Sequence, residues 1–277
     1  MAKENTVYLY GRVLVPPNIR IDTDGNYLSG KIILHTVRRS AASKELLLQG
    51  ERRWDYIAVL SKHAKLIKDR MADLEEGDMV QVKGTLCTYE KIKQFICPHC
   101  GEVINRDGVI IYVDPIFVKR CEIGVSQEEG YRLIEDSEEI SNQVKIMGTL
   151  CREPQLYENP KNKQMECDFQ MASNRNRHIL EDNPEKRTDY PWVKAYGNHA
   201  VDYYEALHVN STVYIDGALQ ARSVKREFVC EKCGEVFEAV DSAIDIIPYN
   251  LEYLKDCSLP GSNSEEEFEG GGDENGK

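Results

Sequence analysis

Two ten-residue stretches of the sequence repeat one arrangement of residues that could bind a metal ion. FICPHCGEVI occupies residues 95–104 and FVCEKCGEVF occupies residues 228–237. In each, two cysteines are separated by two residues, and a glycine follows where the tight turn of a zinc knuckle favours a residue without a Cβ atom. A structural zinc site needs four ligands, so each stretch supplies half of one.

The sequence leaves open how these half-sites are completed. The favoured arrangement joins the two stretches around one Zn²⁺, because it gives four-cysteine coordination without an unmatched ligand. Its ligands are Cys97, Cys100, Cys230 and Cys233. Alternatively, each stretch recruits a third ligand from its own half of the chain, Cys121 or Cys257, and the first stretch can add His99. In a third arrangement, matching stretches close across a dimer.

A redox role is the competing interpretation of a CxxC pair. Such a dithiol is expected at the start of a helix near a βαβ unit, whereas both stretches here lie between two strand patterns. The chain has nine cysteines, and CxxC pairs in a reducing compartment favour metal binding over disulfides. Cys87, Cys151 and Cys167 lie in strand patterns and are predicted to be buried.

Both cysteine stretches belong to a larger unit that occurs twice in the chain. VYLYGRVL at 7–14 matches VKIMGTLC at 144–151, WDYIAVLSKHA at 54–64 matches YPWVKAYGNHA at 190–200, and VQVKGTL at 80–86 matches VYIDGAL at 213–219. The sequence therefore predicts a tandem duplication. Its domains are placed at 1–121 and 142–259, with an acidic linker at 122–141 and a disordered acidic tail at 260–277.

Each copy shows the same order of predicted elements. Five strand patterns occur, with one short helical pattern between the third and the fourth. In the first copy Ala64, Ile67, Met71 and Leu74 recur at helical spacing after Ser61, a candidate N-cap. This order is that of the OB-fold, a partly open five-stranded barrel, and another small β-barrel with the same strand count is the alternative. The predicted fold class is all-β, two tandem OB-folds, each with a zinc-knuckle hairpin between its fourth and fifth strands.

The net charge of −12 is unevenly distributed along the chain. The linker carries −6 and the tail −5, which leaves −1 for the predicted domains. Like-charge runs of this kind are typical of solvated linkers and tails, so the overall charge does not exclude an anionic partner. No apolar run approaches the roughly 20 residues that span a membrane, and the start carries no secretory signal pattern. A soluble protein of the cytoplasm, with no membrane partner, is expected.

The second copy resembles bacterial single-stranded DNA-binding proteins over nearly its whole length. The resemblance lies in NQVKIMGTLCREPQLYENP, CDFQMASNRN and the segment from TDYPWVKAYGNHA to VYIDGALQAR, and N-x-V-x-I-x-G followed by R-E-P is its most specific part. The first copy diverges there, with VPPNIR, but its RRWDYIAVLSKHAKLI follows the third-strand pattern of the family. The resemblance does not cover the linker, the cysteine stretches or the tail.

The resemblance implies sequence-nonspecific binding of single-stranded DNA by base stacking on aromatic side chains. The family's third-strand stacking position corresponds to Trp54 and Tyr190. A second position, six residues later, falls on Leu60 and Tyr196, so the first copy departs from the family there. The competing interpretation places these aromatic side chains in the cores of the barrels.

Further candidates for nucleic-acid binding surround these positions. Tyr56 and Trp192 belong to the same segments, and they are predicted, from alternation along a strand, to point to the opposite face. Basic residues recur in the long loop after the second strand of each copy, where phosphate contacts would make affinity fall with salt. These are Arg38, Arg39, Lys44, Arg52 and Arg53 in the first copy and Arg175, Arg177, Lys186 and Arg187 in the second.

No nucleophile–base pair, phosphate-binding glycine loop or carboxylate pair recurs in both copies, so no enzymatic activity is predicted. The predicted function is single-stranded DNA binding in replication, recombination or repair. The alternatives are a protein–protein scaffold in a replication or conjugation complex and single-stranded RNA binding.

The resembling proteins usually assemble four OB-folds, which implies a homodimer of this duplicated chain. Their acidic tails recruit replication and repair proteins through an apolar tip; here the tail offers Phe268 or serves only as a solvating segment that competes for the basic groove.

Overall fold

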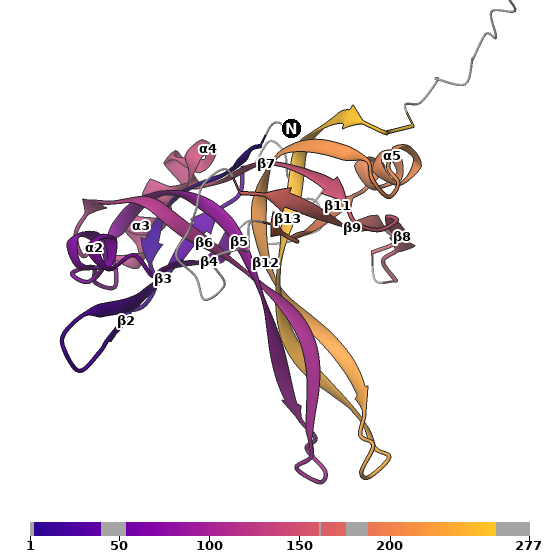
Figure 1. The fold of residues 1–277 in the computed structure, drawn as a ribbon, viewed down its shortest axis with the longest axis horizontal. Coiled ribbons are helices and arrows are strands. Elements are labelled where there is room, and N and C mark those ends of the chain that lie inside the picture. Colours follow the sequence, from indigo (N-terminus) through magenta and orange to yellow (C-terminus); the bar gives the residue numbers. More distant parts are fainter. Residues whose placement is uncertain (1–2, 40–53, 161, 176–187, 259–277) are drawn as a thin grey trace, which may run out of the picture.

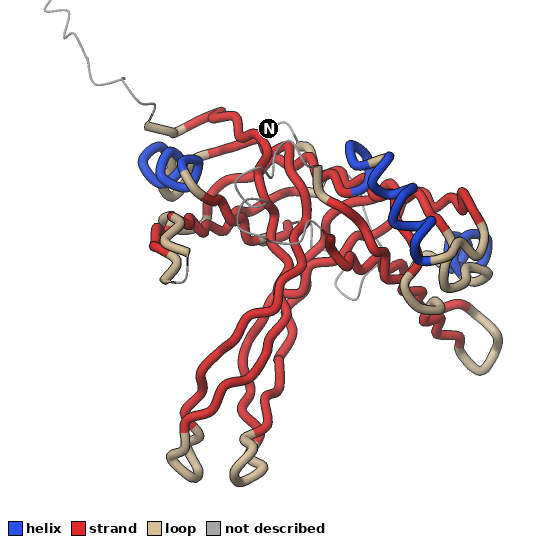
Figure 2. The backbone as a smooth tube through the Cα atoms, turned by 180° about the vertical axis from the view of Figure 1, so that it is seen from behind, coloured by secondary structure: helices blue, strands red, loops and turns tan. Residues whose placement is uncertain are grey.

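The computed structural model describes residues 3–39, 54–160, 162–175 and 188–258 of the chain. Strands dominate these residues, and the fold class is all-β as predicted. The two repeats lie side by side, and a long β-hairpin from each projects away in the same direction (Figure 1). Short helices lie at the periphery of the two repeats (Figure 2). Among the described residues, every helix is too short or too polar to span a lipid bilayer.

The first repeat forms a closed ring of five strands, with one short extra strand. Its strands are β1 (Asn5–Val13), β2 (Asn18–Ile21), β3 (Tyr27–Val37), β4 (Trp54–Ser61), β5 (Met79–Ile96) and β6 (Val103–Glu122). Hydrogen-bonded pairing runs from β1 through β5, β6, β4 and β3 and returns to β1, while β2 pairs only with β3. Buried side chains alternate with half-buried or exposed ones along β1 and β4, because successive residues of a strand face opposite sides of the sheet.

The helical pattern of the first repeat forms one short, irregular helix. It consists of α2 (Ala64–Leu66) followed by a π-helical turn, η2 (Ile67–Met71). Of the four apolar residues in the predicted pattern, Ile67, Met71 and Leu74 are buried, whereas Ala64 at the start of the helix is exposed. The predicted N-cap is wrong: His63 caps the helix through its side chain, and the Ser61 hydroxyl instead accepts a hydrogen bond from the His63 amide.

The second repeat forms an equivalent ring. Its elements are β7 (Asn142–Leu150), β8 (Gln155–Glu158), β9 (Met165–Asn174), β10 (Thr188–Asp189), β11 (Trp192–Tyr196), α5 (Asn198–Ala206), β12 (Thr212–Val229) and β13 (Val236–Lys255). Pairing runs from β7 through β12, β13, β11 and β9 and back to β7. Cys87 and Cys167 are buried as predicted, but Cys151 is exposed because it lies beyond the end of β7 in a turn.

Pairing of β1 with β7 joins the two rings into one continuous sheet. The strands are antiparallel with Val7 opposite Val144, so the two repeats are related by an approximate twofold axis at this pair. Asn5 and Asn142 are both buried and make matching hydrogen bonds, the first to the backbone of Leu86 and the second to that of Leu219. The side chains inside both rings belong to one hydrophobic core.

The acidic segment between the repeats is helical, whereas a solvated linker was expected. Helices α3 (Gln127–Asp136) and α4 (Glu138–Ser141) fill most of it. Ser126 and Glu129 have the spacing of a capping box, and the Ser126 hydroxyl accepts a hydrogen bond from the Glu129 amide at 3.2 Å. Ile134 is fully buried against the first repeat, so apolar packing orders a segment whose composition alone suggests a solvated chain.

Candidate nucleic-acid interface and metal centre

The two projecting hairpins pack against each other to form a four-stranded stalk. The ring strands β5 and β6 continue into one hairpin, and β12 and β13 continue into the other. Phe95 and Phe228 bring their ring centroids to 4.5 Å between the hairpins. Lys93 of one hairpin forms an ion pair with Asp241 of the other at 2.6 Å. These contacts hold the two hairpins together.

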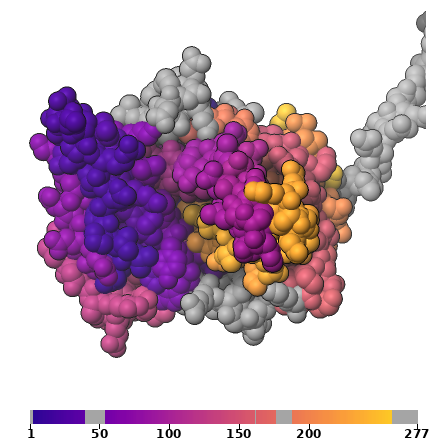
Figure 3. Space-filling view, turned by 90° about the horizontal axis from the view of Figure 1, so that it is seen from below, coloured from indigo at the N-terminus to yellow at the C-terminus, as the bar shows by residue number. Residues whose placement is uncertain are grey.

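The tips of the hairpins have the same backbone geometry. The amide of Cys97 donates to the carbonyl of Glu102 at 2.8 Å, and the amide of Cys230 donates to that of Glu235 at 2.9 Å. Gly101 and Gly234 both adopt a φ of 74°, in the left-handed region that favours glycine. Each tip is therefore a tight turn of the kind predicted. Seen end-on, the two tips lie side by side (Figure 3).

The tips bring their four cysteines together. The sulfur atoms of Cys97 and Cys233 are 3.8 Å apart, those of Cys100 and Cys230 are 3.6 Å apart, and all four lie within 4.8 Å of one another. A tetrahedral site with Zn–S distances of about 2.3 Å places its sulfur atoms about 3.8 Å apart. The spacing of the four thiols thus fits one tetrahedral metal ion held between the hairpins.

The electrostatics of the cluster favour a cation. Hydrogen bonds from the backbone, first from Cys233 and then from Lys232, lower the pKa of Cys230 to about 7. The pKa of Cys233 is raised to about 12: the backbone hydrogen bond from Glu235 opposes this shift, and desolvation, followed by hydrogen bonds with the thiols of Cys230, Cys100 and Cys97, produces it. Four thiols at this spacing cannot all ionise without a positive charge between them, and a divalent metal ion supplies one.

The other proposed ligands lie apart from this cluster. Cys121 and Cys257 are near the far ends of β6 and β13, where their thiols approach the backbone carbonyls of Lys119 and Lys255. His99 lies in the first tip but is exposed and is not a member of the four-residue group. The structure therefore favours the arrangement in which the two stretches share one ion.

The aromatic residues of β4 lie on the outer face of the first repeat. Trp54 and Tyr56 are two residues apart, and residues at i and i+2 share a face of a strand, so the prediction of opposite faces is wrong. Both rings stack on His35, each with a centroid separation of 4.8 Å. Burial, with Arg12 nearby, lowers the pKa of His35 to about 4, so its ring is neutral at pH 7. Tyr56 is 49% exposed and gives this face its accessible aromatic surface.

Helix α3 covers part of this aromatic face. Its Tyr131 ring lies 4.9 Å from that of Trp54 and 5.0 Å from that of His35. Trp54 also packs beside a small buried cluster that includes Ile134 of the same helix. Trp54 is therefore half-buried beneath the segment between the repeats.

Replacement of Tyr131 by alanine is expected to make Trp54 more accessible without unfolding the chain. In a Trp192→Phe background, where Trp54 is the remaining tryptophan, the acrylamide quenching constant should rise about twofold, because Tyr131 lies against the indole ring. Tyr204→Ala is the matched control, because Tyr204 is an exposed tyrosine on α5 of the other repeat. An unchanged quenching constant in the Tyr131 variant would show that the helix does not cover Trp54.

The outer face of the second repeat carries a row of three aromatic residues. Tyr190, Trp192 and Tyr196 lie at even spacing along β11 and the residues before it, so they share one face, again contrary to the predicted alternation. Tyr190 is 44% exposed, and Trp192 and Tyr196 are partly exposed. The guanidinium of Arg152 lies over the Trp192 ring at 5.2 Å. Arg152 was not predicted as a site residue, although it is the arginine of the quoted R-E-P sequence.

Lys194 lies in the same row but is neutralised by acidic neighbours. It forms ion pairs with Glu166 at 2.7 Å and Asp168 at 2.8 Å, and it donates a hydrogen bond to Tyr157. Burial and the nearby carboxylates raise the pKa of Tyr157 well above its ordinary value, so this hydroxyl stays protonated. The cluster is a closed polar network and adds little positive charge to the face.

Two of the predicted basic residues serve the contact between the repeats. Arg38 is buried and forms an ion pair with Asp55 at 2.8 Å, while the amide of Ala221 in the other repeat donates to the same carboxylate at 2.8 Å. The second repeat contains the equivalent ion pair. There Arg175 pairs with Asp189 at 2.5 Å, and the amide of Thr88 in the first repeat donates to Asp189 at 2.6 Å.

Arg38 and Arg175 were predicted to contact phosphates, but neither is available to them. Each is less than 4% exposed and is held by a carboxylate. Arg39 is also engaged: its guanidinium lies 4.2 Å from the centre of the Tyr249 ring and within ion-pair distance of Glu139 and Asp216. The remaining basic predictions lie outside the described residues. They are Lys44, Arg52, Arg53, Arg177, Lys186 and Arg187.

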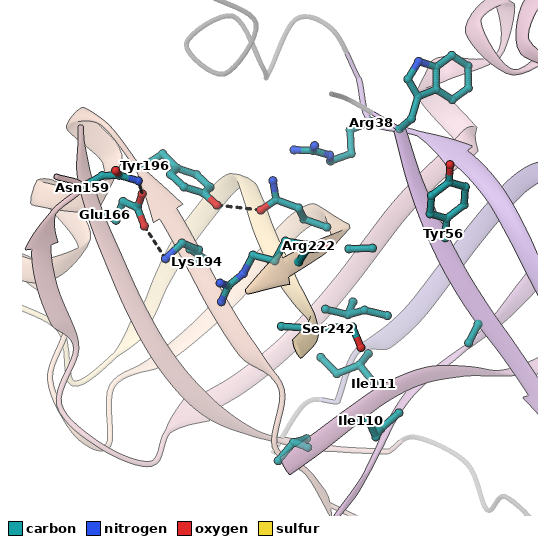
Figure 4. Close-up of a pocket in the computed structure, with 18 of the residues that line it drawn as sticks. Arg38, Tyr56, Ile110, Ile111, Asn159, Glu166, Lys194, Tyr196, Arg222 and Ser242 are labelled. Atoms are coloured by element: carbon teal, nitrogen blue, oxygen red, sulfur yellow. Dashed lines mark hydrogen bonds and ion pairs between the residues drawn. The ribbon is translucent and has the colours of Figure 1, made fainter. Parts of the chain in front are cut away.

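A groove separates the outer faces of the two repeats (Figure 4). Its cavity of about 830 Å³ is lined by Trp54 and Tyr56 on one side and by Tyr196 on the other. The Tyr196 hydroxyl donates to the Gln220 side chain at 2.8 Å, which fixes the ring at the wall of the groove. Residues of the stalk, including Ile110, form its floor. The two aromatic faces thus open onto one shared space.

Comparisons with known proteins agree with this architecture. The single-strand binding protein family model matches residues 141–232. The solved structure of the wild-type single-stranded DNA binding protein from Thermus aquaticus is 18% identical, covers 95% of this chain and 100% of that chain, and superposes with a TM-score of 0.52. A deletion mutant of the same protein is 19% identical with the same coverage and a TM-score of 0.54. At this identity the structural similarity establishes the fold. No curated protein matches the chain.

Proposed function

We propose that this chain, whose residues 141–232 match the single-strand binding protein family model, binds single-stranded DNA without sequence preference in replication, recombination or repair. One observation carries the proposal: both repeats present aromatic side chains on the outer faces that border a common groove. Bases stack on such side chains with about 1–3 kcal/mol each, whatever their sequence. The chain acts by binding, and no catalytic step is assigned to it.

Cationic side chains near the aromatic faces supply the electrostatic part of binding. Within the described part of the chain, Lys91, Arg106 and Arg152 have no ion-pair partner, and all three line a second cavity beside the groove. The basic residues that lie outside the described ranges, Arg52, Arg53, Arg177, Lys186 and Arg187, are proposed to contact phosphates as well. Such contacts release counterions from the strand, so affinity should fall as salt rises.

The four clustered cysteines are proposed to hold one structural Zn²⁺. Four thiolates with no site left for water are the ligand set of closed, structural zinc sites. In this chain the ligands come in pairs from the two hairpins, so the ion would cross-link segments 133 residues apart in sequence. Cys97 and Cys230 are buried beside Phe95 and Phe228, which keeps water from half of the ligands.

Assembly and partner binding complete the proposal. The continuous sheet runs through β6, β5, β1, β7, β12 and β13, and its outer face carries Phe117, which is 44% exposed. We place a homodimer contact on this face. Recruitment of replication or repair proteins is assigned to the acidic tail with Phe268, which lies outside the described residues.

Titration with oligo(dT) tests the binding proposal. Tryptophan fluorescence should be quenched to saturation, and added salt should weaken the affinity. Tyr56→Ala and Tyr196→Ala should each weaken binding about 5- to 150-fold, the range that corresponds to one lost stacking contact. Tyr204→Ala, an exposed tyrosine outside the groove, should leave the affinity within about twofold.

The same titration identifies competing functions. Tighter binding of oligo(rU) than of oligo(dT) would make RNA the preferred ligand. No binding of either polymer at low salt by folded, metal-loaded protein would refute the proposal and favour a role in protein–protein contacts.

A further inference from the structure

We infer that one continuous segment of single-stranded DNA lies in the groove between the two repeats and contacts both aromatic faces at once. The inference rests on the proposed function and adds the path of the ligand. A strand that wrapped each repeat separately would instead occupy two independent sites.

The first step is the continuity of the groove. The cavity of about 830 Å³ between the repeats adjoins a second cavity of about 1080 Å³ beside the second repeat. Both are lined by Val109 of the first repeat and by Arg222, Ala243 and Ile244 of the second. One channel therefore leads from Tyr56, across the stalk, to Trp192. Each part alone has the volume of a site that encloses a small ligand.

The second step is the chemistry along this channel. Tyr56 enters it from one wall and Tyr196 from the opposite wall, with Ile110 and Ile111 between them (Figure 4). These side chains suit unstacked bases, which have apolar faces. Arg106, Lys91 and Arg152 line the second cavity and form no ion pair with any residue in the described ranges, so they supply positive charge there. A single strand can meet both requirements, whereas the bases of a duplex are already stacked and paired.

The third step is the rigidity of the walls. Asp55 accepts a hydrogen bond from Ala221, and Asp189 accepts one from Thr88, so each wall is tied to the opposite repeat. The stalk joins the repeats again below the groove, through the Lys93–Asp241 ion pair and the cysteine cluster. The two aromatic faces are therefore held at a fixed separation. A strand that binds one face lies within reach of the other.

Stoichiometry with a short oligonucleotide tests the inference. Calorimetric titration with (dT)8 should give one oligonucleotide per chain, and Tyr56→Ala and Tyr196→Ala should each weaken that single event about tenfold. Two (dT)8 molecules per chain, with each substitution affecting only one of them, would overturn the inference while leaving single-strand binding intact. Absence of binding by (dT)8 and by long oligo(dT) would instead refute the proposed function.

A substitution that fills the groove provides a second test. Ser223 is exposed and lines the cavity, so Ser223→Trp should block the floor without disturbing the core. We expect at least about a tenfold loss of affinity for long oligo(dT). Leu28→Trp is the matched control, because Leu28 is 47% exposed on β3 and lies outside the groove. Equal affinities of the two variants would place the strand elsewhere, and selective loss in Ser223→Trp would support the groove.

Discussion

Replacement of Cys230 by serine is expected to abolish metal binding and to loosen the junction of the two hairpins. Cys230 is fully buried, and its sulfur lies 3.6 Å from that of Cys100 at the centre of the cluster. Three remaining thiolates leave an open coordination position that water enters, so a closed structural site becomes a weak one. Zinc content should fall from about one ion per chain to none, and the thermal midpoint should fall as well, because binding of a structural ion stabilises the fold.

Controls separate the ligands from the other cysteines. Cys151→Ser changes an exposed cysteine in a turn, and Cys121→Ser removes the alternative third ligand. Both variants should keep one ion per chain. Elemental analysis of unmodified protein purified with reductant provides the reference, and a content below about 0.5 Zn per chain would rule out the structural ion. Loss of zinc in Cys121→Ser would show that the site uses a ligand from within one repeat.

Replacement of Asp189 by asparagine is expected to destabilise the fold by about 3–5 kcal/mol, because it removes the negative charge from the buried ion pair that Asp189 forms with Arg175. The asparagine side chain can still accept the hydrogen bond from the Thr88 amide, which isolates the loss of charge. The free energy of unfolding, measured by urea denaturation, should report the loss. Asp55→Asn should behave in the same way, since Asp55 holds Arg38 and accepts from Ala221 in the equivalent position.

Two further variants test whether the lost charge is the cause of the lower stability of Asp189→Asn. Arg175→Met combined with Asp189→Asn removes both charges of this ion pair and should recover most of the lost stability, because the desolvation cost of the buried pair is removed together with its attraction. Asp136→Asn breaks the exposed ion pair with Arg132 and should cost less than about 1 kcal/mol. If Asp189→Asn cost no more than the exposed control, the paired charges would not be a major contribution to the contact between the repeats.

The buried ion pairs and the cysteine cluster both affect the groove between the two repeats. The ion pairs bind the repeats at the level of the rings, and the cysteines join them at the far end of the stalk. Between these two attachments lies the groove with Tyr56 and Tyr196 on its walls. Loss of either attachment is therefore expected to reduce affinity for single strands as well as stability, since it releases the fixed separation of the two aromatic faces.

Local patterns in the sequence determined the elements of each repeat. Alternating apolar residues predicted the ring strands, and the repeated CxxCG stretches predicted matching turns at the hairpin tips. Duplication and the family resemblance then identified an OB-fold. These inferences succeed because strand alternation and glycine-dependent turns depend on residues that are close together in the chain.

The predictions that proved wrong concern the acidic segment, the faces of two aromatic residues and two buried arginines. The acidic segment at 122–141 was expected to be solvated, although Ser126 and Glu129 offered a capping-box signal and Ile134 could supply a buried contact. Tyr56 and Trp192 were predicted to face away from Trp54 and Tyr190, and this prediction is wrong because residues two apart in a strand share a face. Arg38 and Arg175 look like surface residues in the sequence, and only the carboxylates that face them in the fold show otherwise.

Only the tertiary structure decided how the two halves work together. The sequence placed the cysteine pairs 133 residues apart and left three arrangements open. Antiparallel pairing of β1 with β7, centred on Val7 and Val144, sets the repeats about a twofold axis and directs both hairpins the same way. The same pairing turns the two aromatic faces toward one groove. Such long-range register is fixed by the shared core and the buried ion pairs, so no local pattern in either repeat could specify it.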